Sequence, residues 1–263
     1  MIKVGFLGAG NMAYALAAAI ARGRQDVILV PYDTQADRIE LFKRDFPRVE
    51  GAAHPRQTVE ETRLCVAAVK PQVLPRALQD LGETRGLLVS IAAGVPLAKL
   101  QGYCPLARFI RVMPNTPALV GEMTGAFTPG LGVSAEDREL AAGLLQCAGP
   151  LIEVEESLMD GVTGLSGSGP AFFARLAQGF IDAGRELGLE ESDARLLTLQ
   201  TMKGTAALLL ERGYSCEALI SMVSSPGGTT LAGREILEAS DAGEVIRRTV
   251  LRAAARSREL GGE

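Results

Sequence analysis

The stretch IKVGFLGAGNMA at residues 2–13 decides the fold of the N-terminal half. It joins an apolar run at residues 2–7 to a G-x-G-x-x-A pattern, Gly8-Ala9-Gly10-Asn11-Met12-Ala13, at the head of a helix expected over residues 11–22. In this setting Gly8 allows a tight turn, Gly10 lets a pyrophosphate approach the backbone, and the small Ala13 lets the helix pack against the strand. Amide groups at the helix start then bind the phosphates. The stretch predicts a dinucleotide-binding βαβ unit, the simpler alternative being a turn that needs glycine only for its positive φ.

Strand and helix signals alternate along residues 1–155. Strands are expected at residues 2–7, 27–32, 64–69, 87–91 and 109–112. Helices are expected at residues 11–22, 35–45, 71–81 and 97–100. This alternation is typical of a parallel sheet covered by helices on both faces. We therefore predict an α/β fold in which residues 1–155 form a Rossmann-type, doubly wound dinucleotide-binding domain.

Residues 156–263 carry no strand signal and read as an all-helical second domain. Its helices hold few charges: residues 165–181 contain only Arg175, and residues 196–210 contain only Lys203. Helices that are apolar on most sides need more burial than a small monomeric bundle supplies. We predict a homodimer built through this domain. The alternative is a central helix wrapped by its own domain.

Composition excludes several function classes. The chain has 263 residues, with 27 basic and 31 acidic side chains and a net charge of −4, so nothing draws it electrostatically to nucleic acid or an anionic membrane. One histidine and four scattered cysteines give almost no material for a metal site, and none is predicted. The N-terminal apolar run is too short for a secretory signal, and no apolar run reaches the roughly 18 residues of a membrane span. We expect a cytoplasmic protein with reduced thiols.

Residues at the expected strand ends point to a ligand crevice. Asp33 ends the second strand, where a carboxylate would bind the adenosine ribose hydroxyls and repel a 2′-phosphate, which favours NADH. Asp33 as the N-cap of the helix starting near Gln35 is an equal alternative. Loops at residues 68–71, 92–96 and 113–117 follow the third, fourth and fifth strands, and all face one edge of a parallel sheet.

In the helical half, Ser224-Ser225-Pro226-Gly227-Gly228-Thr229-Thr230 leads into a helix expected over residues 229–239. Amides of Gly227, Gly228 and Thr229 could form an anion cradle on the positive helix end, with hydroxyls of Ser225 and Thr230 beside it. The segment is a candidate carboxylate site. A helix start capped by Ser or Thr after a turn is the competing interpretation.

The motifs taken together resemble the pyrroline-5-carboxylate reductase family. The matching pieces are GFLGAGNMA (5–13), AVKP (68–71), IAAGV (91–95), RVMPNTPALVGE (111–122), TGLSGSGPAF (163–172) and MVSSPGGTT (222–230). The resemblance implies a Rossmann domain followed by a helical dimerisation domain, with five dimers often forming a decamer. It also implies reduction of L-1-pyrroline-5-carboxylate to L-proline, the last step of proline biosynthesis, with NADPH or NADH.

The resemblance also assigns site residues. The cofactor contacts it implies are Leu7, Gly8, Ala9, Gly10, Asn11, Met12, Asp33, Ala68, Val69, Lys70, Pro71, Ala92 and Ala93. The substrate contacts it implies are Ser225, Gly227, Gly228, Thr229 and Thr230, with Asn115 near the nicotinamide end. The sequence departs from the family pattern at three places: Tyr32-Asp33-Thr34 replaces an Asn-Arg or Ser-rich phosphate clamp, Pro55 replaces a common Asn, and Phe172 replaces a frequent Tyr. NADPH is usual in the family, whereas Asp33 favours NADH.

Our mechanistic hypothesis gives Thr230 the catalytic role. Its hydroxyl would hydrogen-bond the ring nitrogen of a cyclic imine, which needs no histidine base. Reduction of a related cyclic imino acid is an alternative. A β-hydroxyacid dehydrogenase would need a lysine with an Asn or Asp partner, which Lys203 lacks among its sequence neighbours. A non-catalytic dinucleotide-binding or pyridoxal-phosphate protein would leave residues 224–230 without a role.

Overall fold

The computed structural model describes residues 1–262. These residues form two compact units: Met1–Pro170 together with the chain from Val250 onward, and Ala171–Thr249. Each unit is described separately. The domain boundary expected between residues 155 and 156 stays a prediction.

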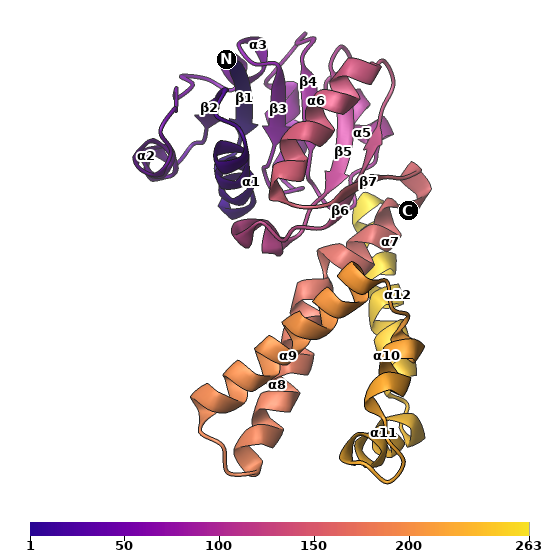
Figure 1. Cartoon of the computed structure of the whole chain (residues 1–263). Coiled ribbons are helices and arrows are strands. Elements are labelled where there is room, and N and C mark those ends of the chain that lie inside the picture. The colour runs from indigo at the N-terminus through magenta and orange to yellow at the C-terminus, as the bar shows by residue number, and fades with distance from the viewer. Residues whose placement is uncertain (263) are drawn as a thin grey trace. The chain divides into compact units, whose positions relative to one another are not determined.

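The first unit is built on a seven-stranded sheet with the strand order β2-β1-β3-β4-β5-β6-β7 (Figure 1). Its strands are β1 (Ile2–Leu7), β2 (Val27–Tyr32), β3 (Leu64–Ala67), β4 (Leu87–Ser90), β5 (Arg108–Met113), β6 (Gly125–Pro129) and β7 (Leu151–Glu153). Strands β1 to β5 pair in parallel, β6 runs antiparallel to β5, and β7 is parallel to β6. The predicted Rossmann-type sheet is confirmed. The order reverses between β1 and β3, which is the position where sheets of this kind open a ligand crevice.

Helices cover both faces of this sheet. They are α1 (Asn11–Gly23), α2 (Ala36–Asp45), α3 (Gln57–Glu60), α4 (Leu74–Gln79), α5 (Leu97–Tyr103) and α6 (Ala135–Leu145). One apolar core joins the sheet to α1, α2 and α6, and a second joins it to α4 and α5. Both β3 and β4 are buried along their whole length, as strands covered on two sides must be.

Some predicted boundaries were wrong. The helix expected from Pro71 begins at Leu74, because the backbone carbonyl of Lys70 accepts hydrogen bonds from the amides of Val73 (2.9 Å) and Leu74 (3.1 Å) and closes a turn first. The strands β6 and β7 were not predicted. The first is the five-residue run GAFTP, which begins with glycine and ends with proline, and the second has three residues. Neither offers a period that a sequence reading detects.

The rest of the chain is helical, as predicted. It comprises α7 (Met159–Val162), a π-helical turn η4 (Thr163–Gly167), and α8 (Gly169–Glu186), α9 (Glu191–Arg212), α10 (Cys216–Val223), α11 (Thr229–Ala239) and α12 (Ala242–Gly261). Helix α12 begins in the second unit, and its residues from Val250 onward belong to the first. None of the helices within residues 1–262 is long and apolar enough to cross a membrane.

Large apolar side chains remain uncovered on the second unit. On α8, Phe180 is 65% exposed, and on α9, Leu210 is 84% exposed; Phe173, Leu196 and Ile236 are exposed as well. A single chain therefore does not bury the helices that the sequence marks as poor in charge. This is the pattern of a surface that another subunit covers.

Candidate active site

The glycine-rich turn at the end of β1 is shaped by its neighbours. Gly8 has φ +93°, and a Cβ atom there would lie 2.9 Å from Val69 Cγ1. Both the left-handed backbone and the close approach of the β3 loop require glycine. Gly10 is different: it has φ −71°, and a Cβ atom there would meet no atom within 4 Å. Gly10 also precedes α1 without a side-chain cap, so no capping side chain occupies the first amides of α1, as a phosphate site needs.

Asp33 is tied to this turn. Its Oδ2 accepts a hydrogen bond from the amide of Ala9 (2.7 Å), and its Oδ1 accepts one from the amide of Gln35 (3.0 Å). The N-cap alternative is wrong, since α2 begins at Ala36 with Gln35 as its cap. The Arg38 guanidinium lies at the same turn and donates to the carbonyl of Ala9 (2.9 Å) and to Asn11 Oδ1 (3.0 Å). The glycine-rich turn therefore has a carboxylate, Asp33, and a guanidinium, Arg38, bonded directly to its backbone.

A cavity of about 440 Å³ lies beside this turn, at the switch between β1 and β3. Its lining residues are Leu7, Gly8, Tyr32, Asp33, Thr34, Pro55, Val69, Val73, Arg76, Ala77 and Asp80. Four predicted cofactor residues are among them: Leu7, Gly8, Asp33 and Val69. The volume falls in the usual range for ligand pockets. Pro55, which replaces a common Asn of the family, also lines this cavity.

The other predicted cofactor residues follow β3 and β4. Ala68 and Val69 lie against Gly8, and Lys70 and Pro71 make the turn before α4. Ala92 is buried, and its neighbour Ala93 is partly exposed after β4. The structure thus places all these residues at the carboxyl ends of adjacent parallel strands, in one unit. The residues present fit a dinucleotide.

Asn115 is buried, with 6% of its surface exposed, and both ends of its side-chain amide have partners. Its Oδ1 accepts from the amide of Thr124 (3.0 Å), and its Nδ2 donates to the carbonyl of Ser166 (3.1 Å). Ser166 belongs to the π-helical turn η4, and such turns often mark functional sites. The contact of Asn115 with substrate stays a prediction, while the structure gives Asn115 a clear role in joining β5 to η4.

The segment at residues 224–230, the predicted anion site, lies in the second unit at the start of α11. Gly228 is the N-cap of α11 and offers no side-chain cap, so the capped-helix interpretation is wrong. The amide of Gly228 closes a turn on the carbonyl of Ser225 (3.0 Å), and a Cβ atom on Gly228 would lie 2.5 Å from Ser225 Oγ. The uncapped amides of Thr229 and Thr230 then begin the helix.

Arg234, one turn into α11, is a cation that was not predicted from the sequence. Arg234 donates to Ser224 Oγ (3.2 Å) and pairs with Glu238 (2.5 Å). Its position four residues after Thr230 could have indicated that Arg234 lies near the candidate site, because residues i and i+4 lie on the same helix face. Arg234 adds positive charge beside the helix start.

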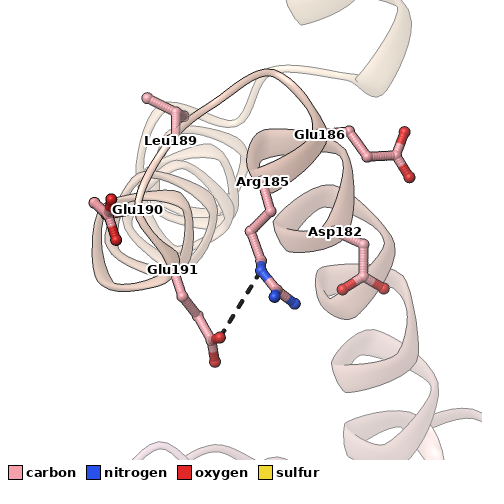
Figure 2. Close-up of a pocket in the computed structure, with 6 residues that line it drawn as sticks. All are labelled: Asp182, Arg185, Glu186, Leu189, Glu190 and Glu191. Atoms are coloured by element: carbon pink, nitrogen blue, oxygen red, sulfur yellow. Dashed lines mark ion pairs between the residues drawn. The ribbon is translucent and has the colours of Figure 1, made fainter.

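A second hollow lies at the turn between α8 and α9. Figure 2 shows its lining of Asp182, Arg185, Glu186, Leu189, Glu190 and Glu191, with Arg185 paired to Glu191 at 3.8 Å. It contains none of the predicted site residues. Within residues 1–262, no group of three or more His, Cys, Asp or Glu side chains is arranged to hold a metal ion.

The fold and the site define the class of protein: a Rossmann-type oxidoreductase with an appended helical unit. Residues 156–260 match the family profile "Pyrroline-5-carboxylate reductase dimerisation", and residues 3–94 match "NADP oxidoreductase coenzyme F420-dependent". A pyrroline-5-carboxylate reductase of Arabidopsis thaliana is 36% identical over 264 residues, which cover 98% of this chain and 95% of the relative. The chain belongs to the pyrroline-5-carboxylate reductase family.

Solved structures agree with this assignment. A pyrroline-5-carboxylate reductase from Coxiella burnetii superposes with a TM-score of 0.90 at 29% identity and covers 98% of both chains. The Plasmodium falciparum pyrroline carboxylate reductase, solved with NADP bound, gives a TM-score of 0.86 at 28% identity and covers 99% of this chain and 98% of its own. The family resemblance expected from the motifs is confirmed.

Proposed function

We propose that this chain reduces L-1-pyrroline-5-carboxylate to L-proline, the final step of proline biosynthesis, with a reduced nicotinamide dinucleotide. The observation that supports the proposal is the uncapped start of α11 at Gly228, whose first amides suit a small carboxylate, in a chain whose α1 also begins without a side-chain cap after a glycine-rich turn. A β-hydroxyacid dehydrogenase is not favoured, because the curated relatives carry the reductase name over nearly their whole length.

The residues at the start of α11 have separate roles in substrate binding and catalysis. Amides of Gly227, Gly228 and Thr229 hold the substrate carboxylate, helped by the positive end of the helix and the Ser225 hydroxyl. The Thr230 hydroxyl donates to the ring nitrogen and stabilises it as it becomes an amine. When bound, the dinucleotide would supply a hydride to the imine carbon, and the ring nitrogen would take its proton from water or a hydroxyl. Orientation of the two reactants carries most of the rate acceleration, about 7 kcal/mol or more.

The cofactor is held by the first unit. We assign Leu7 to Met12, Asp33, Ala68 to Pro71, Ala92 and Ala93 to this role. We propose that the protein accepts NADH in preference to NADPH, because the Asp33 carboxylate at the cavity wall binds ribose hydroxyls and repels a 2′-phosphate. The two nearby guanidinium groups already have partners: Arg38 donates to the carbonyl of Ala9 and to Asn11 Oδ1, and Arg76 in the same wall pairs with Asp80 (3.9 Å).

Rates with the two coenzymes test this preference. Asp33→Ser should shift the ratio of kcat/KM for NADH to that for NADPH toward NADPH by about tenfold, the effect of removing roughly 1.4 kcal/mol of repulsion. Lys70→Ala, at a proposed cofactor contact in the turn after β3 and outside the lining of the cavity, is the control and should alter both coenzymes alike. An unchanged ratio in Asp33→Ser would remove the basis for the preference.

We further propose a cytoplasmic homodimer, with five dimers assembling into a decamer. The uncovered apolar side chains of α8 and α9 and the dimerisation profile at residues 156–260 support the dimer. In such an assembly, residues 224–230 of one subunit complete the site whose cofactor is held by the other.

The test is the loss of dinucleotide absorbance when pyrroline-5-carboxylate is added, with the homologous six-membered cyclic imine as a second substrate. Thr230→Ala should lower kcat/KM by at least about tenfold, which is modest for a proton-donating group, and leave dinucleotide affinity unchanged. Thr230→Ser keeps the hydroxyl and should retain most of the rate. A Thr230→Ala enzyme as fast as the parent would exclude this residue from catalysis. A faster reaction with the larger ring would reassign the substrate.

A further inference from the structure

The last turns of α12 contact the loop at residues 91–96 that follows β4. Gly94 has φ +74°, and a Cβ atom on it would lie 2.5 Å from the carbonyl oxygen of Ser257 and 3.0 Å from Leu260 Cβ. A Cβ atom on Gly261 would in turn lie 2.5 Å from the carbonyl oxygen of Gly94. Two backbones therefore meet directly, and the Lys99 ammonium bonds the carbonyl of Gly261 at the same place. All of these residues belong to the first unit.

A chain of polar groups, in which Arg111 and Ser257 are buried while Asp160 and Glu156 are partly exposed, joins the same two segments by a second route. Ser257 Oγ donates to Asp160 Oδ1 (2.5 Å), and Asp160 pairs with Arg111 (3.5 Å). Arg111 also pairs with Glu156 (3.3 Å), and Glu156 Oε1 accepts from the amide of Leu97 (2.6 Å). Leu97 is the first residue of α5 and follows the loop directly. The route therefore runs from α12 through α7 and β5 to the end of the loop.

The burial and charge of the side chains in this second route indicate a role other than filling the core. The Arg111 side chain is 5% exposed, and Ser257 is 2% exposed. A buried guanidinium between two carboxylates adds little stability compared with apolar side chains of the same volume, but it fixes geometry, because each hydrogen bond has a set direction. Both routes end on one loop, and that loop contains Ala92 and Ala93, two of the proposed cofactor contacts.

We propose that Ser257, Asp160 and Arg111 are positioning residues that hold residues 91–96 in the form that binds the dinucleotide, with the end of α12 as the rigid support. The inference rests on the proposed cofactor site. Although α12 lies in the helical half of the sequence, the proposal gives its last turns a role in binding the cofactor.

The test compares Ser257→Ala with Arg256→Ala. The second variant removes a neighbouring exposed ion pair with Glu259 on the same turn of α12 and leaves the loop contacts intact. Titration of NADH by its own fluorescence should show a dissociation constant raised about tenfold in Ser257→Ala, the order expected for loss of one hydrogen bond, and unchanged in Arg256→Ala. Asp160→Asn, which weakens the link to Arg111, should behave like Ser257→Ala.

Hydrogen exchange in the protein without cofactor provides a readout that general destabilisation does not imitate. Peptides covering residues 91–96 should exchange faster in Ser257→Ala, while peptides from β1 and α1 exchange as in the parent. Unchanged dinucleotide affinity and unchanged exchange at residues 91–96 would overturn the proposal, as would equal acceleration throughout the first unit. A parent protein that binds NADH but does not reduce pyrroline-5-carboxylate would defeat the proposed reaction and leave this result standing.

Discussion

Replacing Gly10 by alanine separates the effect on folding from the effect on dinucleotide binding. Gly10 has φ −71°, which alanine adopts freely, and its Cβ atom would meet nothing within 4 Å. Alanine lowers the entropy of the unfolded chain, worth about 0.4–1 kcal/mol, and is a poorer N-cap by a similar amount. The two effects offset each other, so Gly10→Ala should shift Tm by no more than about 3 °C.

Its effect on binding is large, because the new methyl group occupies the space through which a pyrophosphate reaches the first amides of α1. Loss of one charge-assisted hydrogen bond costs about 1.5–3 kcal/mol, so the dissociation constant of NADH should rise by about tenfold to 150-fold. Fluorescence titration of NADH measures this constant, and circular dichroism gives Tm on the same sample.

Substitutions at two other glycines serve as controls for Gly10→Ala. Gly8→Ala, with φ +93° and a 2.9 Å contact to Val69, should lose about 2–5 kcal/mol of stability as well as binding. Gly143→Ala lies within α6, has no atom within 4 Å of its Cβ position, and should stabilise the fold by about 0.5–1 kcal/mol without altering binding. A Gly10→Ala protein that binds NADH as tightly as the parent would refute the assignment of this turn to the pyrophosphate.

Three further outcomes are expected. Burial raises the pKa of Asp137, but bonds from Arg108 and from the Ser134 amide outweigh it and leave the pKa below its ordinary 3.8. Asp137→Asn should therefore lower the free energy of unfolding, measured in urea at pH 7, by about 1–2 kcal/mol. The difference in stability between parent and variant should vanish as the pH falls through the lowered pKa of Asp137. A difference that stays constant down to pH 2 would contradict the ion pair. Burial raises the pKa of the Cys65 thiol to about 12, so iodoacetamide at pH 8 should label the exposed Cys216 first; mass spectrometry showing equal labelling would contradict the buried site. Phe180→Glu on α8 should give a monomer by sedimentation velocity, and an unchanged mass would place the interface elsewhere.

The sequence predicted those parts of the fold that local pattern determines. The limits of β1 and β2 follow from apolar runs closed by glycine or a charge, and the start of α11 follows from a proline–glycine turn before a helix-forming run. The short strands β6 and β7 escaped prediction because pairing with neighbours, and not composition, makes them strands.

The candidate site was likewise only partly predictable from local sequence pattern. Motif spacing located Gly8, Gly10 and the segment at residues 224–230. The bonds that fix the site join residues far apart in the chain: Asp33 to Ala9, and Ser257 to Asp160 across 97 positions. No local period signals such pairs, since each depends on how separate elements pack.

The central claim is that the start of α11 and the glycine-rich turn after β1 serve one reaction. A crystal structure of the assembled protein with oxidised dinucleotide and proline tests it directly. The account predicts the proline carboxylate on the amides of residues 227–229 and the ring within about 3–3.5 Å of the nicotinamide C4 atom, the separation of reacting groups. Proline bound at any other place, or at residues 227–229 with no nicotinamide within reach in the assembly, would contradict it.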